Sequence, residues 1–540
     1  MRELRSAWAA CLLLGACTGQ LTGPSVRGSD PTTVTPGTVT PGQPGVLLST
    51  RVRLLNNLEY NNTIAALLGD TSQPARTFPA PDPQSGFSNN GSQTVTDLSA
   101  SVYDTAAQTL AHNAVQNLSA LLPCNPSPSQ EAACARQFIA SFGPRAFRRP
   151  LTSADSAGLQ GVYDAARAHG GDFSTGIEMV VYAVLSSGSF LYVPELGLDG
   201  PSGTEVELDP YEKASALSYF LLASPPDDAL LAAAGSKGLD TPDQVEAQAR
   251  RLLLDSRARP QALRFFTEWF EIGPSTKDAT VYPSYRTLGP SFLNETPAFI
   301  EDVIFNGDGR LQSLLEANYT FVDSGLNTFY GLPGTVAATG LTKVSLSGTP
   351  RLGLLTHGSF LARHGDATMS SPIKRGVFIR RRLLCEALPP PPTGLNVTPP
   401  IKSDVKTTRQ LFDAHITNPN CSGCHTQINP IGNGFEAFDG EGGYRTTENG
   451  QPVDSSGELT NTQDANGAFN GVPELAHRLA RSNEVKQCFA RMLFRFGSAQ
   501  TSVLTEQELL YEAPTRLPDS YQELAMMYVR SKLFNRRVLP

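Results

Sequence analysis

One short motif constrains this chain more than any other segment: the sequence Cys-x-x-Cys-His formed by Cys421, Cys424 and His425. Two cysteines three residues apart project from the same side of a helical turn. Both thiols can therefore bond to the two vinyl groups of one porphyrin, and the adjacent histidine can bind the iron. With 8 cysteines and 7 histidines in 540 residues, chance would produce this spacing on the order of 0.002 times per chain. The motif predicts one covalently bound haem c.

Two other uses of such a cysteine pair fit the sequence less well. A structural zinc site needs a second Cys or His pair at close spacing, and the other cysteines are scattered singly apart from Cys124 and Cys134, which are not spaced as Cys-x-x-Cys. A thioredoxin-like redox pair follows a strand in a βαβ unit, whereas a Pro-Asn turn precedes Cys421.

The start of the chain has the pattern of an export signal. A basic first segment precedes an apolar run at residues 7–14, which ends in Leu-Gly-Ala-Cys at residues 14–17. This ending resembles a bacterial lipoprotein box, so residues 1–17 are predicted to be a lipoprotein signal peptide and Cys17 to carry lipid. The alternative is an ordinary signal peptide cut at the small residues before Cys17. The apolar run is too short to span a membrane.

The expected location follows from this anchor. Thr18 after the lipidated cysteine resembles the sorting pattern of Gram-negative lipoproteins that reach the outer membrane. We therefore expect a cell-envelope protein that contacts the membrane through its N-terminal lipid. Residues 18–48 are rich in Thr, Pro and Gly and cannot bury a core, so they are expected to be a linker between the lipid and a folded body.

Export also permits disulfides. Four of the eight cysteines lie in the signal peptide or in the haem motif, which leaves Cys124, Cys134, Cys385 and Cys488. Cys124 and Cys134 flank a short Pro-containing loop and are predicted to pair, while Cys385 and Cys488 either pair or remain buried free thiols.

The folded body reads as mainly α. A chain of 540 residues is long enough for several compact units, and its net charge of −8 argues against nucleic acid as a partner. Helical spacing of apolar residues, with capping and Pro signals, predicts helices. The expected helices cover 51–68, 97–122, 131–142, 153–168, 171–187, 209–222, 242–254, 259–270, 296–305, 310–317, 324–330, 352–363, 373–384, 406–416, 474–480, 484–496, 506–510 and 520–534. The best strand candidate is 336–347, and Pro389–Pro392 is expected to be a stiff linker.

Several segments resemble the modules of large planctomycete-type cytochrome c proteins, a family also common in myxobacteria. The similar segments are 53–64 for the first module, 142–152 for the second, 215–221 and 225–227 for the third, 351–355, 371–376, 384–385, 389–392, 428–432, 435–439 and 443–445 for the haem-bearing fourth, and 488–500 for the last. The resemblance implies a secreted haem protein and no particular reaction. It gives a helical module at 49–123, a second at 131–195, a third at 205–335, a cytochrome c-like haem module at 349–465 and a C-terminal module at 468–540.

The second axial ligand of the iron is less constrained than the first. In a small class I cytochrome, this ligand would fall between the helices expected at 406–416 and 484–496, but residues 445–483 contain no Met and only one His, His477. The first-ranked candidate is His415, because a histidine recurs at that place in the family's haem module. Other candidates are Met369, Met492, His357 and His364, and an open sixth position is the alternative.

Arg445 is expected either to bind a haem propionate or to form a surface salt bridge.

These features favour an envelope-anchored c-type haem protein that transfers electrons to or from a redox partner, which the sequence does not identify. An alternative is a haem-dependent oxidoreductase, peroxidase- or oxidase-like, with an open iron site. A second alternative is a surface binding protein in which the haem is structural. The sequence contains no Ser-His-Asp order, phosphate-binding loop or paired-carboxylate signature that would add another catalytic centre.

Overall fold

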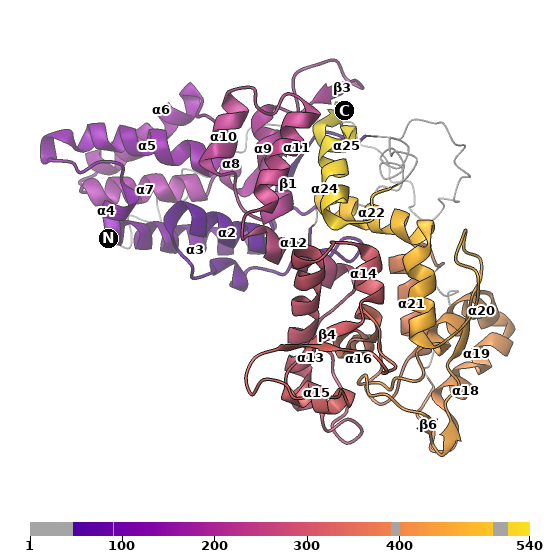
Figure 1. The fold of residues 1–540 in the computed structure, drawn as a ribbon. Coiled ribbons are helices and arrows are strands. Elements are labelled where there is room, and N and C mark those ends of the chain that lie inside the picture. Colours follow the sequence, from indigo (N-terminus) through magenta and orange to yellow (C-terminus); the bar gives the residue numbers. More distant parts are fainter. Residues whose placement is uncertain (1–46, 90, 390–399, 501–516) are drawn as a thin grey trace. The chain divides into compact units, whose positions relative to one another are not determined.

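The computed structural model describes residues 47–89, 91–389, 400–500 and 517–540 (Figure 1). These residues are mainly helical, as predicted, and their strands form two-stranded antiparallel pairs. The signal peptide with Cys17, nearly all of the 18–48 linker, the expected helix at 506–510 and residues 390–392 lie outside the described residues. No helix in the described ranges is both long enough and apolar enough to cross a membrane.

The first two expected modules share one hydrophobic core, in which Ile64, Phe138 and Val181 are fully buried. Their elements are β1 (Arg51–Leu54), α2 (Asn57–Leu68), α3 (Asp97–Ala114), α4 (Leu118–Leu121), α5 (Glu131–Phe147), α6 (Ser153–Ala168), α7 (Phe173–Leu185), α8 (Gly188–Leu191) and β2 (Tyr192–Glu195). A disulfide joins Cys124, just after α4, to Cys134 in α5.

The helix expected at 51–68 is wrong in its first third. Residues Arg51–Leu54 form strand β1, which pairs antiparallel with β2. Helix α2 begins after Asn56, whose side chain accepts the Glu59 N–H at 2.9 Å while the Glu59 carboxylate accepts the Asn56 N–H at 3.0 Å. This capping box fixes the helix start because it satisfies two backbone donors that would otherwise be unpaired.

Most of the remaining described segments share a second, larger core. A smaller separate cluster is formed by Leu288, Phe292, Val322, Leu326, Tyr330, Leu332 and Leu346. Before the motif helix, the elements of the remaining segments are β3 (Glu205–Glu207), α9 (Pro210–Leu222), α10 (Asp228–Gly235), α11 (Pro242–Leu253), α12 (Ala258–Trp269), α13 (Tyr285–Glu301), α14 (Leu311–Glu316), β4 (Tyr319–Val322), α15 (Ser324–Tyr330), β5 (Thr342–Ser345), α16 (Gly358–Arg363), α17 (Pro372–Phe378), α18 (Thr408–Phe412) and α19 (Ala414–Thr417). The elements that follow are α20 (Pro419–Asn433), β6 (Thr447–Glu448), β7 (Gln451–Pro452), β8 (Ser456–Leu459), β9 (Gly467–Asn470), α21 (Gly471–Arg481), α22 (Asn483–Ser498), α24 (Tyr521–Arg530), α25 (Lys532–Asn535) and β10 (Arg536–Val538). The strand pairs are β3 with β10, β4 with β5, β6 with β7 and β8 with β9.

Residues from three of the expected modules meet in this second core. The Trp269 ring at the end of α12 stacks on Phe489 of α22, with 5.1 Å between ring centroids. The Trp269 indole N–H also donates to the carbonyl oxygen of Arg382 at 2.7 Å, and a disulfide joins Cys385 to Cys488. The third, haem and C-terminal segments therefore share buried apolar contacts, while the module boundaries given above stay a prediction.

A buried carboxylate links the first strand of the described chain to its last. Glu195 of β2 accepts from Arg51 of β1 at 2.8 Å and also pairs with Arg537 of β10. Burial works against the charged form, but the two guanidinium groups outweigh it and hold the pKa of Glu195 well below its ordinary value.

Candidate functional site

The predicted haem motif lies on the first two turns of α20. Asn418 caps this helix, because its side-chain oxygen accepts the Asn420 N–H at 3.0 Å, and Pro419 occupies the first helical position, where no N–H is needed. Cys421 and Cys424 follow one turn apart, and both are half-buried. The local sequence therefore builds the helix that presents both cysteines.

The two motif cysteines differ from every other cysteine that the structure describes. Cys421 and Cys424 carry free thiols. The other four cysteines in the described ranges form the Cys124–Cys134 and Cys385–Cys488 disulfides. Two thiols on one helical turn, next to a histidine, are the donor set that a thioether-linked haem needs.

His425 is held by a side chain one turn later. Its Nδ1 lies 2.9 Å from the side-chain oxygen of Asn429, and the Asn429 amide nitrogen donates to the Phe412 carbonyl at 3.0 Å. Asn429 is fully buried. Sequence reasoning missed this residue, although its spacing of four from His425 places both on one helix face.

His415 on α19 lies beside His425. The two ring centroids are 4.8 Å apart at an interplanar angle of 44°. The Nδ1 of His415 is buried and has no hydrogen-bond partner, and burial, together with the neighbouring His425, lowers the pKa of His415. An imidazole with an unused nitrogen next to the motif histidine fits a second iron ligand.

The other candidate ligands make contacts elsewhere. His357 is buried with its Nδ1 3.0 Å from Thr296, and His364 is buried with its Nδ1 3.0 Å from the Phe360 carbonyl. His477 pairs with Glu316 on α14 at 2.6 Å. Met492 packs in the hydrophobic core and Met369 is buried beside Gly440. Of these six candidates, His415 is the one that packs against the His425 ring.

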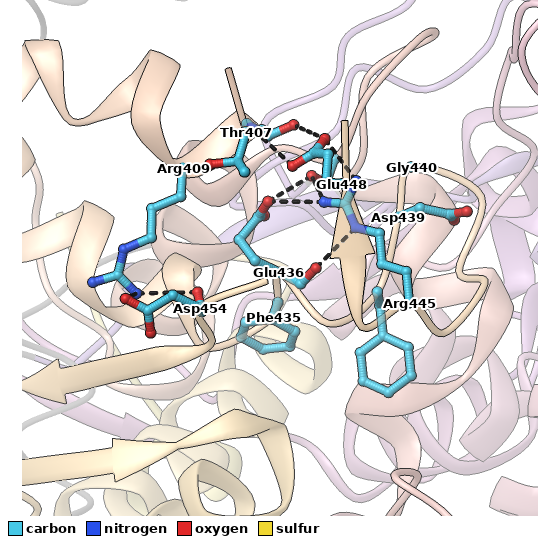
Figure 2. A network of polar contacts seen from close by, with 12 residues as sticks. Thr407, Arg409, Phe435, Glu436, Asp439, Gly440, Arg445, Glu448 and Asp454 are labelled. Atoms are coloured by element: carbon cyan, nitrogen blue, oxygen red, sulfur yellow. Dashed lines mark hydrogen bonds and ion pairs between the residues drawn. The ribbon is translucent and has the colours of Figure 1, made fainter. Parts of the chain in front are cut away.

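Arg445 lies between two carboxylates (Figure 2). Its Nη2 donates to Glu436 and to Ser370 Oγ, both at 3.0 Å, and its Nη1 is 2.7 Å from Glu448. Its Nε donates to the Glu436 carbonyl at 3.0 Å. All three guanidinium nitrogens are therefore engaged. These ion pairs are largely buried rather than at the surface, because the side chains of Arg445, Glu436 and Glu448 are 17%, 2% and 12% exposed. The binding of Arg445 to a haem propionate stays a prediction.

The same network supports the helix before the motif. The Glu448 carboxylate accepts from the Thr408 backbone N–H and from its hydroxyl, each at 2.8 Å. Thr408 begins α18, where unpaired N–H groups and the helix dipole favour a negative charge. The network therefore joins Arg445 to the start of the helical segment that leads to His415.

Fold and motif together define a class: a mainly helical, multi-module protein with a cytochrome c-like module. Four family models match the chain, each described as a protein of unknown function. They are PSD3 (DUF1587) at residues 53–116, PSD5 (DUF1595) at 134–195, PSD4 (DUF1592) at 208–332 and PSCyt3 (DUF1588) at 351–448. The matched segments together cover more than half of the chain.

The chain belongs to the family of planctomycete cytochrome-associated multi-module proteins, as the resemblance implied. The PSCyt3 match contains the Cys-x-x-Cys-His motif. Neither the curated proteins nor the solved structures yielded a match.

Proposed function

We propose that this protein is an envelope-anchored c-type haem protein that transfers electrons. Cys421 and Cys424 would bind the porphyrin through thioethers and His425 would bind the iron, which supplies a one-electron redox centre when the haem is bound. The observation that carries the proposal is the pair of free thiols beside His425 in a chain whose other described cysteines are oxidised.

The compartment follows from the same cysteines. Disulfides persist in oxidising compartments outside the cytosol, and two of them join described residues. The Leu-Gly-Ala-Cys segment at residues 14–17 adds an export and lipidation signal. We propose that lipid on Cys17 holds the protein at the outer membrane of a Gram-negative cell, where its partner is a redox protein. Intact mass of the membrane fraction tests this, because a soluble chain that begins elsewhere and has no acyl mass contradicts the anchor.

The haem itself is tested by denaturing electrophoresis with haem staining. Wild-type protein from a cytochrome c-competent host should keep its haem, and Cys421→Ala/Cys424→Ala should lose it, because axial coordination alone does not survive denaturation. The matched control is Cys124→Ala/Cys134→Ala, which also removes two cysteines and should keep the haem. Wild-type protein without covalent haem refutes the proposal, and a zinc or disulfide role for the two cysteines then takes its place.

The electron-transfer role depends on the sixth ligand, for which we propose His415. A carrier keeps six ligands in both oxidation states, so the visible and resonance Raman spectra of the wild type should be low-spin throughout, and His415→Ala should become high-spin. His477→Ala is the control, since His477 is half-exposed and paired with Glu316. A wild-type iron that is five-coordinate and reacts with peroxide favours the oxidoreductase alternative, and an iron that does not change oxidation state favours a structural haem.

A further inference from the structure

We propose that Asn429 is a positioning residue that keeps the proton of neutral His425 on Nδ1 and leaves Nε2 free to bind a metal. The tautomer follows from hydrogen bonds within the chain. Its effect on an iron rests on the proposed function.

The direction of each hydrogen bond follows from which groups can donate and which can only accept. The Phe412 carbonyl can only accept, so the group of Asn429 that faces it at 3.0 Å must be the amide nitrogen. The side-chain oxygen of Asn429 therefore faces His425, at 2.9 Å from Nδ1. Because that oxygen cannot donate, Nδ1 must carry the hydrogen, and in the neutral ring Nε2 then has a free lone pair.

Burial makes this arrangement hard to replace. Asn429 is fully buried, so neither of its two hydrogen bonds can be exchanged for water without cost. A hydrogen bond to the outer nitrogen of a ligating histidine fixes the ring orientation and raises its basicity. Phe412 also ends α18, three residues before His415, so one amide connects His425 with the segment that carries the other candidate ligand.

The tautomer can be measured without haem. Full-length Cys421→Ser/Cys424→Ser protein, labelled with 15N-histidine, should show neutral His425 protonated at Nδ1, with the His425 signal assigned by its loss in His425→Gln. Asn429→Leu should shift the proton toward Nε2. The matched control is Asn433→Leu one turn later, because Asn433 is also buried but its amide oxygen has no partner. A wild-type His425 protonated at Nε2 overturns the inference, whether or not the protein binds haem.

The loaded protein gives a second, independent readout. Haem staining should remain at wild-type level in Asn429→Leu and Asn429→Asp, while their reduction potentials move in opposite directions. Loss of the acceptor in Asn429→Leu should raise the potential, and the stronger carboxylate acceptor in Asn429→Asp should lower it. A tenfold change in the preference for one oxidation state corresponds to about 59 mV.

A merely structural role of Asn429 would shift the reduction potentials of both variants in the same direction. That result, or no shift in either variant, overturns the inference. If Asn429→Leu does not fold, the reduction potential of Asn429→Asp is compared with that of Asn433→Leu. A potential of Asn429→Asp that is not the lower of the two overturns the inference. A wild type that carries no haem would refute the proposed function alone, since the tautomer measurement does not depend on it.

Discussion

At the scale of single residues, burial changes acid–base chemistry most clearly at Glu295. Its carboxylate accepts from the Thr320 hydroxyl at 2.6 Å and from the Tyr330 hydroxyl at 2.7 Å, and it is completely buried. Burial raises its pKa to about 7. The neighbouring His357 responds in the opposite direction, because burial lowers its pKa to about 3. Each group is therefore uncharged over a wider pH range in the folded state than in the unfolded chain.

These shifts predict a pH dependence of stability that a single variant can isolate. Since the folded pKa of Glu295 exceeds the unfolded value of 4.5, its contribution is fully present below that value and is lost as the pH rises toward 7. The free energy of unfolding of wild type should therefore fall relative to Glu295→Gln by about 3 kcal/mol across this range. Urea denaturation of both proteins over a pH series measures this difference. A difference that stays constant with pH contradicts the prediction.

At the scale of elements, sequence reasoning worked where the signals were local. The helices expected at 153–168 and 209–222 are confirmed as α6 and α9, to within one residue, because capping residues next to each helix fix its start. Strand β1 was missed because its pairing partner β2 lies about 140 residues away, and nothing within residues 51–68 encodes that pairing. Helix α5 runs past Pro144 to Phe147 because Ala146 and Phe147 are buried in the core, where tertiary packing outweighs local propensity.

The candidate site likewise combines local features, which the sequence predicts, with contacts between distant residues, which it does not. The Cys-x-x-Cys-His motif and its helical turn could be predicted because their spacing is local, but the full length of α20 was not expected. The contact between His415 and His425 was anticipated only from the family resemblance. The hydrogen bond from Asn429 to Phe412 and the link from Glu448 to Thr408 join residues 17 and 40 positions apart, and a single sequence gives no signal for such pairs.

The contact between α17 and α20 leads to a prediction at this scale. A Cβ atom on Gly432 would overlap the Pro372 carbonyl oxygen, so this close approach requires glycine. Gly432→Ala should lower the free energy of unfolding by roughly 3 kcal/mol or more. A Cβ atom on Gly423, in the same helix, would meet no other atom within 4 Å, so Gly423→Ala should instead raise stability by roughly 0.5–1 kcal/mol. Urea denaturation compares the two variants, and equal effects would argue against the close packing.

At the scale of the whole folded body, Glu195 connects strands from both ends of the described chain. Its side chain is 5% exposed, and those of Arg51 and Arg537 are 10% and 2% exposed. Removing one member of a buried ion pair leaves the remaining charges unpaired and costs about 3–5 kcal/mol. The three side chains together therefore connect the β1–β2 pair to β10.

Glu195→Gln should lower the free energy of unfolding by about 3 kcal/mol or more at neutral pH. Because the folded pKa of Glu195 is depressed, its contribution is present above the unfolded value of 4.5 and is lost as the pH falls below it. The difference from wild type should therefore shrink in acid. The control is Glu205→Gln, whose partner Arg536 is 3.4 Å away and about half-exposed, so its effect should be near zero. An equally small loss for Glu195→Gln would contradict the role of this cluster.

The Cys385–Cys488 disulfide makes the segment between its cysteines a closed covalent ring, with 103 residues of sequence separation and both motif cysteines inside it. A protease that cuts this ring once opens it but releases nothing, since both new ends stay bonded to the rest of the chain. Release of a peptide containing Cys421 and Cys424 requires two cuts, or one cut followed by reduction. The segment that presents the two thiols is thus retained through a single backbone break for as long as this disulfide stays oxidised.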